Sequence, residues 1–193
     1  MQTAHEPSRL ADKTHNGGKV CLSDRVQYNG GPDFLLLFPS FMSAYHNANN
    51  STCQTNVHQL STTLTMYAQD WDETLPPSAH WADAALTLKP VTVKTFHCPE
   101  AKSPYSYVFN KHLDRLRLRD VSEPSQIPMV YEGYSVEFNA ASDGKAIPPA
   151  LRHNVDATII GFADGHSKRF RESTLGELNW TDKAAPESDP LKP

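Results

Sequence analysis

The sequence contains no long hydrophobic run. No segment approaches the roughly 20 consecutive apolar residues that a helix needs to cross a bilayer, and residues 1–30 lack the apolar stretch of a signal peptide. Only 38% of the residues are hydrophobic, and the mean hydropathy is −0.54. We therefore expect a modest core and a chain that starts without an export signal.

The sequence also lacks an excess of basic residues. Its 18 lysines and arginines stand against 22 aspartates and glutamates, for a formal net charge of −4. A nucleic-acid-binding protein would carry a basic patch. The one basic segment, residues 111–119, is interrupted by Asp114 and by leucines and reads as a solvated helix face. No nucleic-acid partner is expected.

Glycine and cysteine are scarce. The 9 glycines are outnumbered by 15 prolines, which favours fixed turns and extended connections. The three cysteines, Cys21, Cys53 and Cys98, form no Cys-x-x-Cys pair, which argues against a structural zinc site. Cys53 and Cys98 are candidates for a disulfide that closes a loop of about 45 residues, and two buried free thiols are the alternative. Cys21 lies in a polar stretch and reads as a spare thiol.

The sequence carries no familiar catalytic motif. It has no Gly-x-Ser-x-Gly elbow, no phosphate-binding loop of the Walker type and no His-Glu-x-x-His zinc motif. His97 and Cys98 are adjacent, as a Cys–His nucleophile would be, but Pro99 and the possible disulfide favour a structural role. We expect no enzyme activity.

The strongest pattern that is present is an apolar stripe with helical spacing. It runs from Cys53 to Trp71 in steps of three and four, with polar residues between. We predict a helical segment over residues 34–75, in which the helix itself begins near Pro39 and ends near 70–73, because Pro76 and Pro77 disfavour helical geometry before them. Trp71 is expected in the core as the last member of the stripe.

Strand patterns follow the helix. Residues 105–110 and 127–132 are rich in aromatic and β-branched side chains. Residues 157–163 and 166–170 flank Asp164-Gly165, which predicts a hairpin with a type I′ turn. The predicted organisation is a disordered segment 1–33, a helix 34–75, a β-rich head 76–172 and a flexible tail 173–193, with 133–152 as a surface loop.

Several short blocks occur in a recognisable order. They are residues 36–41, 53–57, 66–76, 96–99, 152–154 and 162–166, which read LLFPSF, CQTNV, MYAQDWDETLP, FHCP, RHN and FADGH. This order resembles the prepilin-like proteins related to type IV pilins and to the pseudopilins of type II secretion, whose C-terminal domain carries a His…Asp-Gly signature. The resemblance covers about residues 35–172.

The resemblance implies a fold and a function. The implied fold class is α+β and pilin-like, with one long N-terminal helix packed on a small antiparallel sheet. The implied function is a non-enzymatic structural subunit of a pilus-like or pseudopilus-like assembly, located at the cell surface or in the periplasm. Its partners would be other pilin-like subunits or secretion-system proteins. A membrane contact is expected only if the gene product carries a further N-terminal apolar helix.

Two features depart from the family pattern. Family members have a glycine followed by phenylalanine, glutamate and a long apolar helix, whereas this chain reads NGGPDF at residues 29–34. The signature residues His153 and Asp164 have ten residues between them, where the family has nine. An inserted residue would be absorbed by a loop, or would form a bulge if it fell in a strand.

Two groups of side chains are candidate metal ligands. Asp70, Asp72 and Glu73 offer the oxygen atoms that calcium prefers, although acidic residues also suit a solvated helix end. No other cofactor is expected. The signature residues are His153, Asp164, Gly165 and His166. Two imidazoles and a carboxylate among them could bind zinc or iron, whereas a turn would explain Asp164 and Gly165 equally well.

Two alternative functions remain open at this stage. One is a soluble carbohydrate- or protein-binding module on a pilin-like scaffold, with Trp71, Trp81 and Trp180 as candidates for a sugar-binding face. The other is a metal-dependent hydrolase that uses His153, Asp164 and His166.

Overall fold

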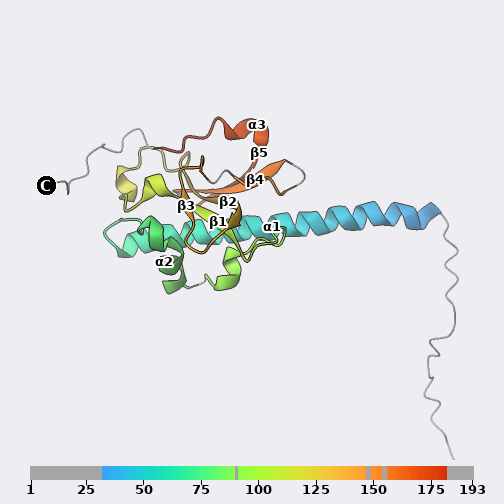
Figure 1. Ribbon diagram of the computed structural model, residues 1–193, viewed down its shortest axis with the longest axis horizontal. Coiled ribbons are helices and arrows are strands. Elements are labelled where there is room, and N and C mark those ends of the chain that lie inside the picture. The colour runs from blue at the N-terminus through green and yellow to red at the C-terminus, as the bar shows by residue number, and fades with distance from the viewer. Residues whose placement is uncertain (1–31, 90, 147–148, 154–155, 182–193) are drawn as a thin grey trace, which may run out of the picture.

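The structure is a computed structural model that describes residues 32–89, 91–146, 149–153 and 156–181, with side chains from Met42 onward except that of Ser135. Most of the predicted disordered segment 1–33, which contains Cys21, and residues 182–193 of the predicted flexible tail 173–193 lie outside these residues. Residues 32–33 belong to the first helix, and residues 173–175 of the predicted tail are helical. The described chain forms one long helix and a head built around a sheet (Figure 1). The predicted α+β class is therefore correct.

Helix α1 is continuous from Pro32 to Asp70. A proline suits the first turn of a helix, where its missing N–H has no partner in any case. After Asp70 the chain turns through Asp72 and Glu73, whose φ angles are +49° and +59°, so the helix ends where the sequence predicts. None of the helices that the structure describes is both long enough and apolar enough to cross a membrane.

The sheet has five strands in the order β3-β1-β2-β4-β5. Their bounds are β1 Tyr105–Asn110, β2 Pro128–Val136, β3 Ala141–Ser142, β4 Ala157–Phe162 and β5 Ser167–Arg171. The predicted antiparallel sheet is correct for the pairs β1–β2, β2–β4 and β4–β5, whereas β3 pairs in parallel with β1. A tight turn joins β2 to β3, so these two strands run in opposite directions. Since β1 also runs opposite to β2, β3 must run parallel to β1 on its free edge.

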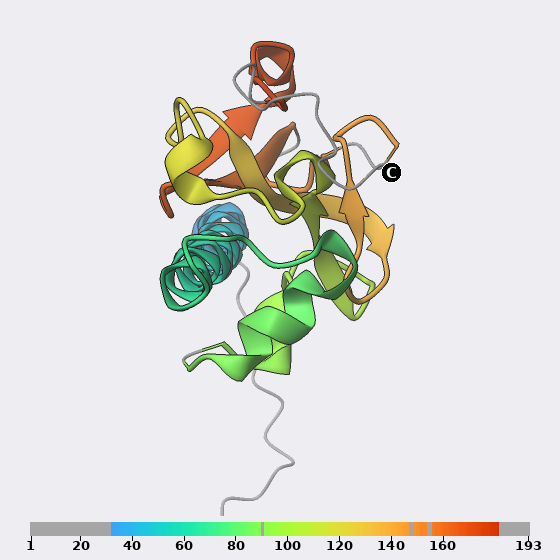
Figure 2. The same ribbon diagram turned by 90° about the vertical axis from the view of Figure 1, so that its left-hand side faces the viewer.

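The shorter helices lie on both sides of the sheet. Helix α2 is Trp81–Thr87 and α3 is Glu172–Leu175. Short 3-10 helices occupy Ser78–His80, Val93–Phe96, Lys111–Leu113 and Leu118–Asp120. Helices α1 and α2 cover one face, and α3 lies over the other (Figure 2). The predicted loop 133–152 instead contains the end of β2, all of β3 and the buried Ala150.

The apolar stripe of α1 forms the centre of the core. Cys53, Val57, Leu60 and Leu64 are fully buried against the sheet. The stripe ends earlier than predicted, because Trp71 is 53% exposed. The reason is that Trp71 lies in the turn after α1, where the helical spacing no longer determines which way a side chain faces.

The β4–β5 hairpin has the predicted strands but a different turn. The amide of Gly165 donates to the carbonyl of Phe162 at 2.9 Å. Gly165 has a φ of +92°, whereas Asp164 does not have a positive φ. A type I′ turn would need positive φ at both central positions. Of Asp164 and Gly165, only the glycine therefore has a left-handed backbone conformation.

Strand β4 packs closely against α1 at Gly161. A Cβ atom at this position would lie 2.0 Å from Ser61 Oγ and 2.8 Å from a methyl of Val57. Gly161→Ala is expected to lower the free energy of unfolding by about 1–3 kcal/mol, because the added methyl group overfills the contact. Urea denaturation measures the change. Gly176→Ala is the control, since nothing lies within 4 Å of that position; equal effects of the two variants would contradict the close contact.

Candidate functional site: the joint between helix α1 and the head

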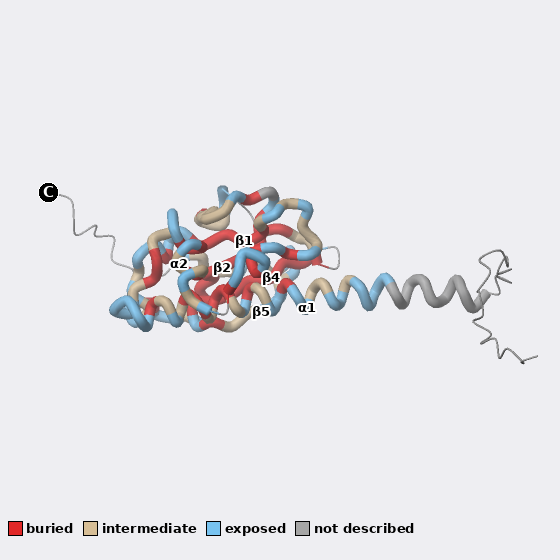
Figure 3. The backbone as a smooth tube through the Cα atoms, turned by 90° about the horizontal axis from the view of Figure 1, so that it is seen from below, coloured by how far each residue is buried: buried red, intermediate tan, exposed pale blue. Residues whose placement is uncertain are grey.

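Helix α1 has two parts that differ in burial. From Cys53 onward it packs on the sheet, whereas residues 32–52, which we call the arm, project from the head (Figure 1). None of the arm side chains that the structure describes, from Met42 to Thr52, is buried (Figure 3). The arm and the head therefore meet at one place, close to Cys53.

Polar contacts from Glu100 hold the base of the arm. Its Oε1 accepts a hydrogen bond from Asn49 Nδ2 at 2.8 Å and lies 3.1 Å from His46 Nδ1. One turn into the head, Asn56 Nδ2 donates to the carbonyl oxygen of His97 at 3.0 Å. Partial burial acts to raise the pKa of Glu100, but these hydrogen bonds and the charge of His46 outweigh it and lower that pKa below its ordinary value. Glu100 is thus ionised at neutral pH and favours a fixed arm.

A disulfide between Cys53 and Cys98 crosses the joint. Of the two alternatives that the sequence leaves open, the structure contains the covalent one. The Cα atoms lie 5.3 Å apart, within the usual range for a disulfide. The bond ties the first buried turn of α1 to the segment that carries Glu100.

A buried ion pair lies beside the disulfide. Glu132 Oε1 is 2.9 Å from His153 Nε2, and neither side chain is exposed to solvent. The second carboxylate oxygen of Glu132 accepts a hydrogen bond from the amide of Ile159 at 3.0 Å. Burial, together with the charge of Glu132, raises the pKa of Tyr107 above its usual range, so Tyr107 stays neutral opposite Glu132 in the sheet.

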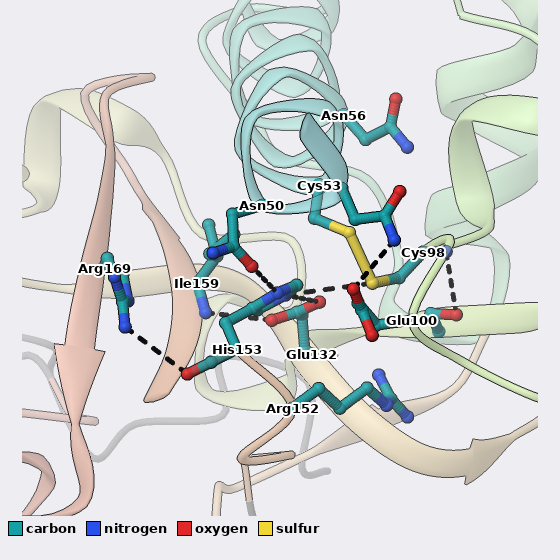
Figure 4. Close-up of polar contacts among 12 residues, drawn as sticks. Asn50, Cys53, Asn56, Cys98, Glu100, Glu132, Arg152, His153, Ile159 and Arg169 are labelled. Atoms are coloured by element: carbon teal, nitrogen blue, oxygen red, sulfur yellow. Dashed lines mark hydrogen bonds and ion pairs between the residues drawn. A yellow bond between two sulfur atoms is a disulfide. The ribbon is translucent and has the colours of Figure 1, made fainter. Parts of the chain in front are cut away.

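His153 connects the ion pair to both the arm and the disulfide (Figure 4). Its Nδ1 lies 2.5 Å from Asn50 Oδ1, and its Nε2 lies 3.8 Å from Cys98 Sγ. A guanidinium nitrogen of Arg169 lies 3.4 Å from its carbonyl oxygen. The imidazole of His153 therefore contacts Asn50, Glu132 and Cys98, and Arg169 holds the backbone of the same residue.

The joint also contains a group of possible metal ligands. Cys53, Cys98, Glu132 and His153 are all buried, and one ligand atom from each lies within 4.8 Å of the others. Within the residues that the structure describes, no other group of three or more cysteine, histidine or acidic side chains converges in this way.

The signature residues predicted as one site are separated. His153 is buried at the N-terminal end of β4, whereas Asp164 and His166 lie past its other end, in the turn to β5. There His166 Nδ1 contacts Asp164 Oδ1 at 2.5 Å on the surface, and His58 Nδ1 lies 2.9 Å from the carbonyl oxygen of Gly165. A six-residue strand spans roughly 20 Å. The geometry therefore does not bring the three predicted ligands together.

The acidic residues Asp70, Asp72 and Glu73 lie in a surface hollow shared with arginines. Glu73 Oε2 is 3.6 Å from Arg119 Nε, and Arg117 also lines the hollow. The arginines supply the positive charge that a calcium ion would otherwise supply. Calcium binding at this position remains a prediction from the sequence.

The sequence alone gives no role to three residues of the joint, Asn50, Glu100 and Glu132. Glu132 falls in the second predicted strand, whereas Asn50 and Glu100 belong to no pattern that the sequence singles out. A charged residue within the strand-like run 127–132 is an available signal, because a buried carboxylate needs a partner. No comparable signal marks Asn50.

Comparison of the chain with protein-family models, with curated proteins and with solved structures gave no significant match.

Proposed function

We propose that the protein is a non-enzymatic, pilin-like structural subunit whose arm packs against the arms of other copies in a pilus-like or pseudopilus-like assembly. The observation that carries the proposal is the arm itself. Residues 32–52 continue α1 for roughly 31 Å at 1.5 Å per residue, and its described side chains are not buried by the head.

A projecting helix whose described side chains are not buried favours packing against another molecule. Most helical stability in proteins comes from packing of an apolar face rather than from the intrinsic helix propensity of the residues. The arm sequence contains apolar residues over much of its length, and Met42 and Tyr45 are 54% and 58% exposed. The others in this segment are Phe34, Leu35, Leu36, Leu37, Phe38 and Phe41. Packing between arms would remove Met42 and Tyr45 from water.

The joint supports the same proposal. A subunit that assembles through a projecting helix must hold that helix at a fixed angle to its head. Here the disulfide and the contacts of Glu100 and His153 fix the base of the arm. Disulfides persist in oxidising compartments, which favours a location at the cell surface or in the periplasm.

Assembly of the purified full-length chain tests the proposal. We expect particles larger than a monomer in sedimentation velocity and electron microscopy, because arm packing buries apolar surface. The double variant Met42→Glu with Tyr45→Glu should shift the population to monomers. Val93→Glu is the matched control, since Val93 is 56% exposed on the head. A natural chain that stays monomeric at all concentrations, or equal effects of arm and head variants, would contradict it.

A second candidate is the carbohydrate- or protein-binding module. The observation in its favour is the stack of Tyr67 and Trp71, whose ring centroids lie 4.6 Å apart with planes inclined by 6°. Pro77 and His80 border the exposed indole. Aromatic faces of this kind bind apolar faces of ligands while their polar edges stay wet. A strictly monomeric chain in the sedimentation experiment would favour this candidate.

A further inference from the structure

We propose that the joint is a redox-controlled zinc site: when the Cys53–Cys98 disulfide is reduced, the two sulfurs, His153 and Glu132 bind one Zn²⁺. The proposal concerns the joint and does not depend on assembly through the arm. It rests on the convergence of four buried ligand atoms within 4.8 Å of one another.

The donor set suits zinc. Zn²⁺ is bound by cysteine sulfur, histidine nitrogen and carboxylate oxygen, with four ligands in a tetrahedron in structural sites. The usual zinc–ligand lengths place tetrahedral ligand atoms roughly 3.3–3.8 Å apart. Cys98 Sγ and His153 Nε2 are already 3.8 Å apart. His153 Nε2 and Glu132 Oε1, at 2.9 Å, would need to separate by about 0.5 Å.

The contacts around the ligands orient them for a metal. In zinc sites the ligating histidine donates its second ring N–H to an oxygen acceptor, which fixes the tautomer. Here Nδ1 of His153 faces Asn50 Oδ1 at 2.5 Å, so Nε2 is directed at the sulfur and the carboxylate. The amide of Ile159 holds Oε2 of Glu132 and leaves Oε1 for the metal. Figure 4 shows these groups around the disulfide.

The redox step is balanced with a dithiol as the reductant. The dithiol gives two electrons and two protons to the Cys53–Cys98 bond and becomes a cyclic disulfide, and the S–S bond becomes two thiols. Binding of Zn²⁺ then displaces both thiol protons and any proton on His153 Nε2 to solvent. Each sulfur can rotate about its own Cα–Cβ bond, so the backbone, with Cα atoms 5.3 Å apart, keeps its position.

The experiment compares zinc binding by the oxidised and reduced forms. Full-length protein with Cys21→Ala, so that thiols come only from the pair, is made metal-free, reduced with a dithiol and freed of reductant without air. Calorimetric titration with Zn²⁺ should give one ion per reduced chain and binding at least 100-fold weaker in the oxidised form. Titration with Co²⁺ should give the charge-transfer absorption of thiolate ligands.

Variants assign the ligands. His153→Gln and Glu132→Gln should each weaken zinc binding at least tenfold, whereas His166→Gln, in the exposed pair with Asp164, should leave it unchanged. Circular dichroism follows the fold throughout. The proposal is overturned if the reduced chain binds zinc no better than the oxidised chain, if His153→Gln binds as tightly as its parent, or if reduction unfolds the head and zinc does not restore it.

Discussion

Replacing His153 with leucine is expected to lower the free energy of unfolding by about 3–5 kcal/mol, because it leaves the carboxylate of Glu132 buried without the imidazole that it pairs with. Both side chains of the pair have no exposure to solvent. Water therefore cannot compensate Glu132, and, among the residues that the structure describes, the remaining hydrogen bond to it comes from the amide of Ile159. Urea denaturation followed by circular dichroism gives the change directly.

Two further variants separate loss of the ion pair from loss of packing. In the double variant Glu132→Gln with His153→Leu, no buried charge remains and glutamine can still accept from Ile159. It should therefore be more stable than His153→Leu alone. His166→Leu removes an exposed histidine from its pair with Asp164 and should cost less than about 1 kcal/mol. Additive effects of the two substitutions at the buried pair would show that the charges are not coupled.

Replacing both Cys53 and Cys98 with alanine is expected to lower the free energy of unfolding by about 4 kcal/mol. The bond joins residues separated by 45 positions, and in the chain-entropy model its removal frees a loop of that length in the unfolded state. The measurement is again urea denaturation, in a Cys21→Ala background with a chelator present so that bound metal adds nothing. The free energy of unfolding should also fall more steeply with urea concentration, because the unfolded chain becomes less compact without the cross-link.

Reduction of the parent chain is the matched control for this variant. The reduced parent, in the same chelator, should fall to the stability of the double alanine variant within about 1 kcal/mol, since both lack the same cross-link. A loss below about 1 kcal/mol in both would mean that the bond adds no constraint to the unfolded chain.

Local patterns explain the parts of the fold that the sequence predicts correctly. The end of α1 at Asp70 follows from the loss of helical spacing before two prolines, and the β4–β5 hairpin follows from Asp-Gly between two strand-like runs. These signals lie within a few residues of one another. They do not depend on what packs against the segment, so the sequence alone is sufficient to read them.

Other features depend on groups that are distant in the chain. The direction of β3 depends on its place beside β1, and the exposure of Trp71 depends on where the head ends. Helix α1 begins at Pro32, earlier than the expected start near Pro39. Neither strand order nor exposure is encoded in the spacing of neighbouring residues.

By itself the sequence determined one amphipathic helix, a β-rich head and two cysteines able to join them, because periodicity and turn chemistry act over a few residues. Only the tertiary structure decided that Asn50, Cys53, Cys98, Glu132 and His153 meet at one buried joint. These residues come from α1, a loop, a central strand and the segment before β4. Long-range packing of the sheet against the helix is what brings them together, and residue spacing carries no information about such contacts.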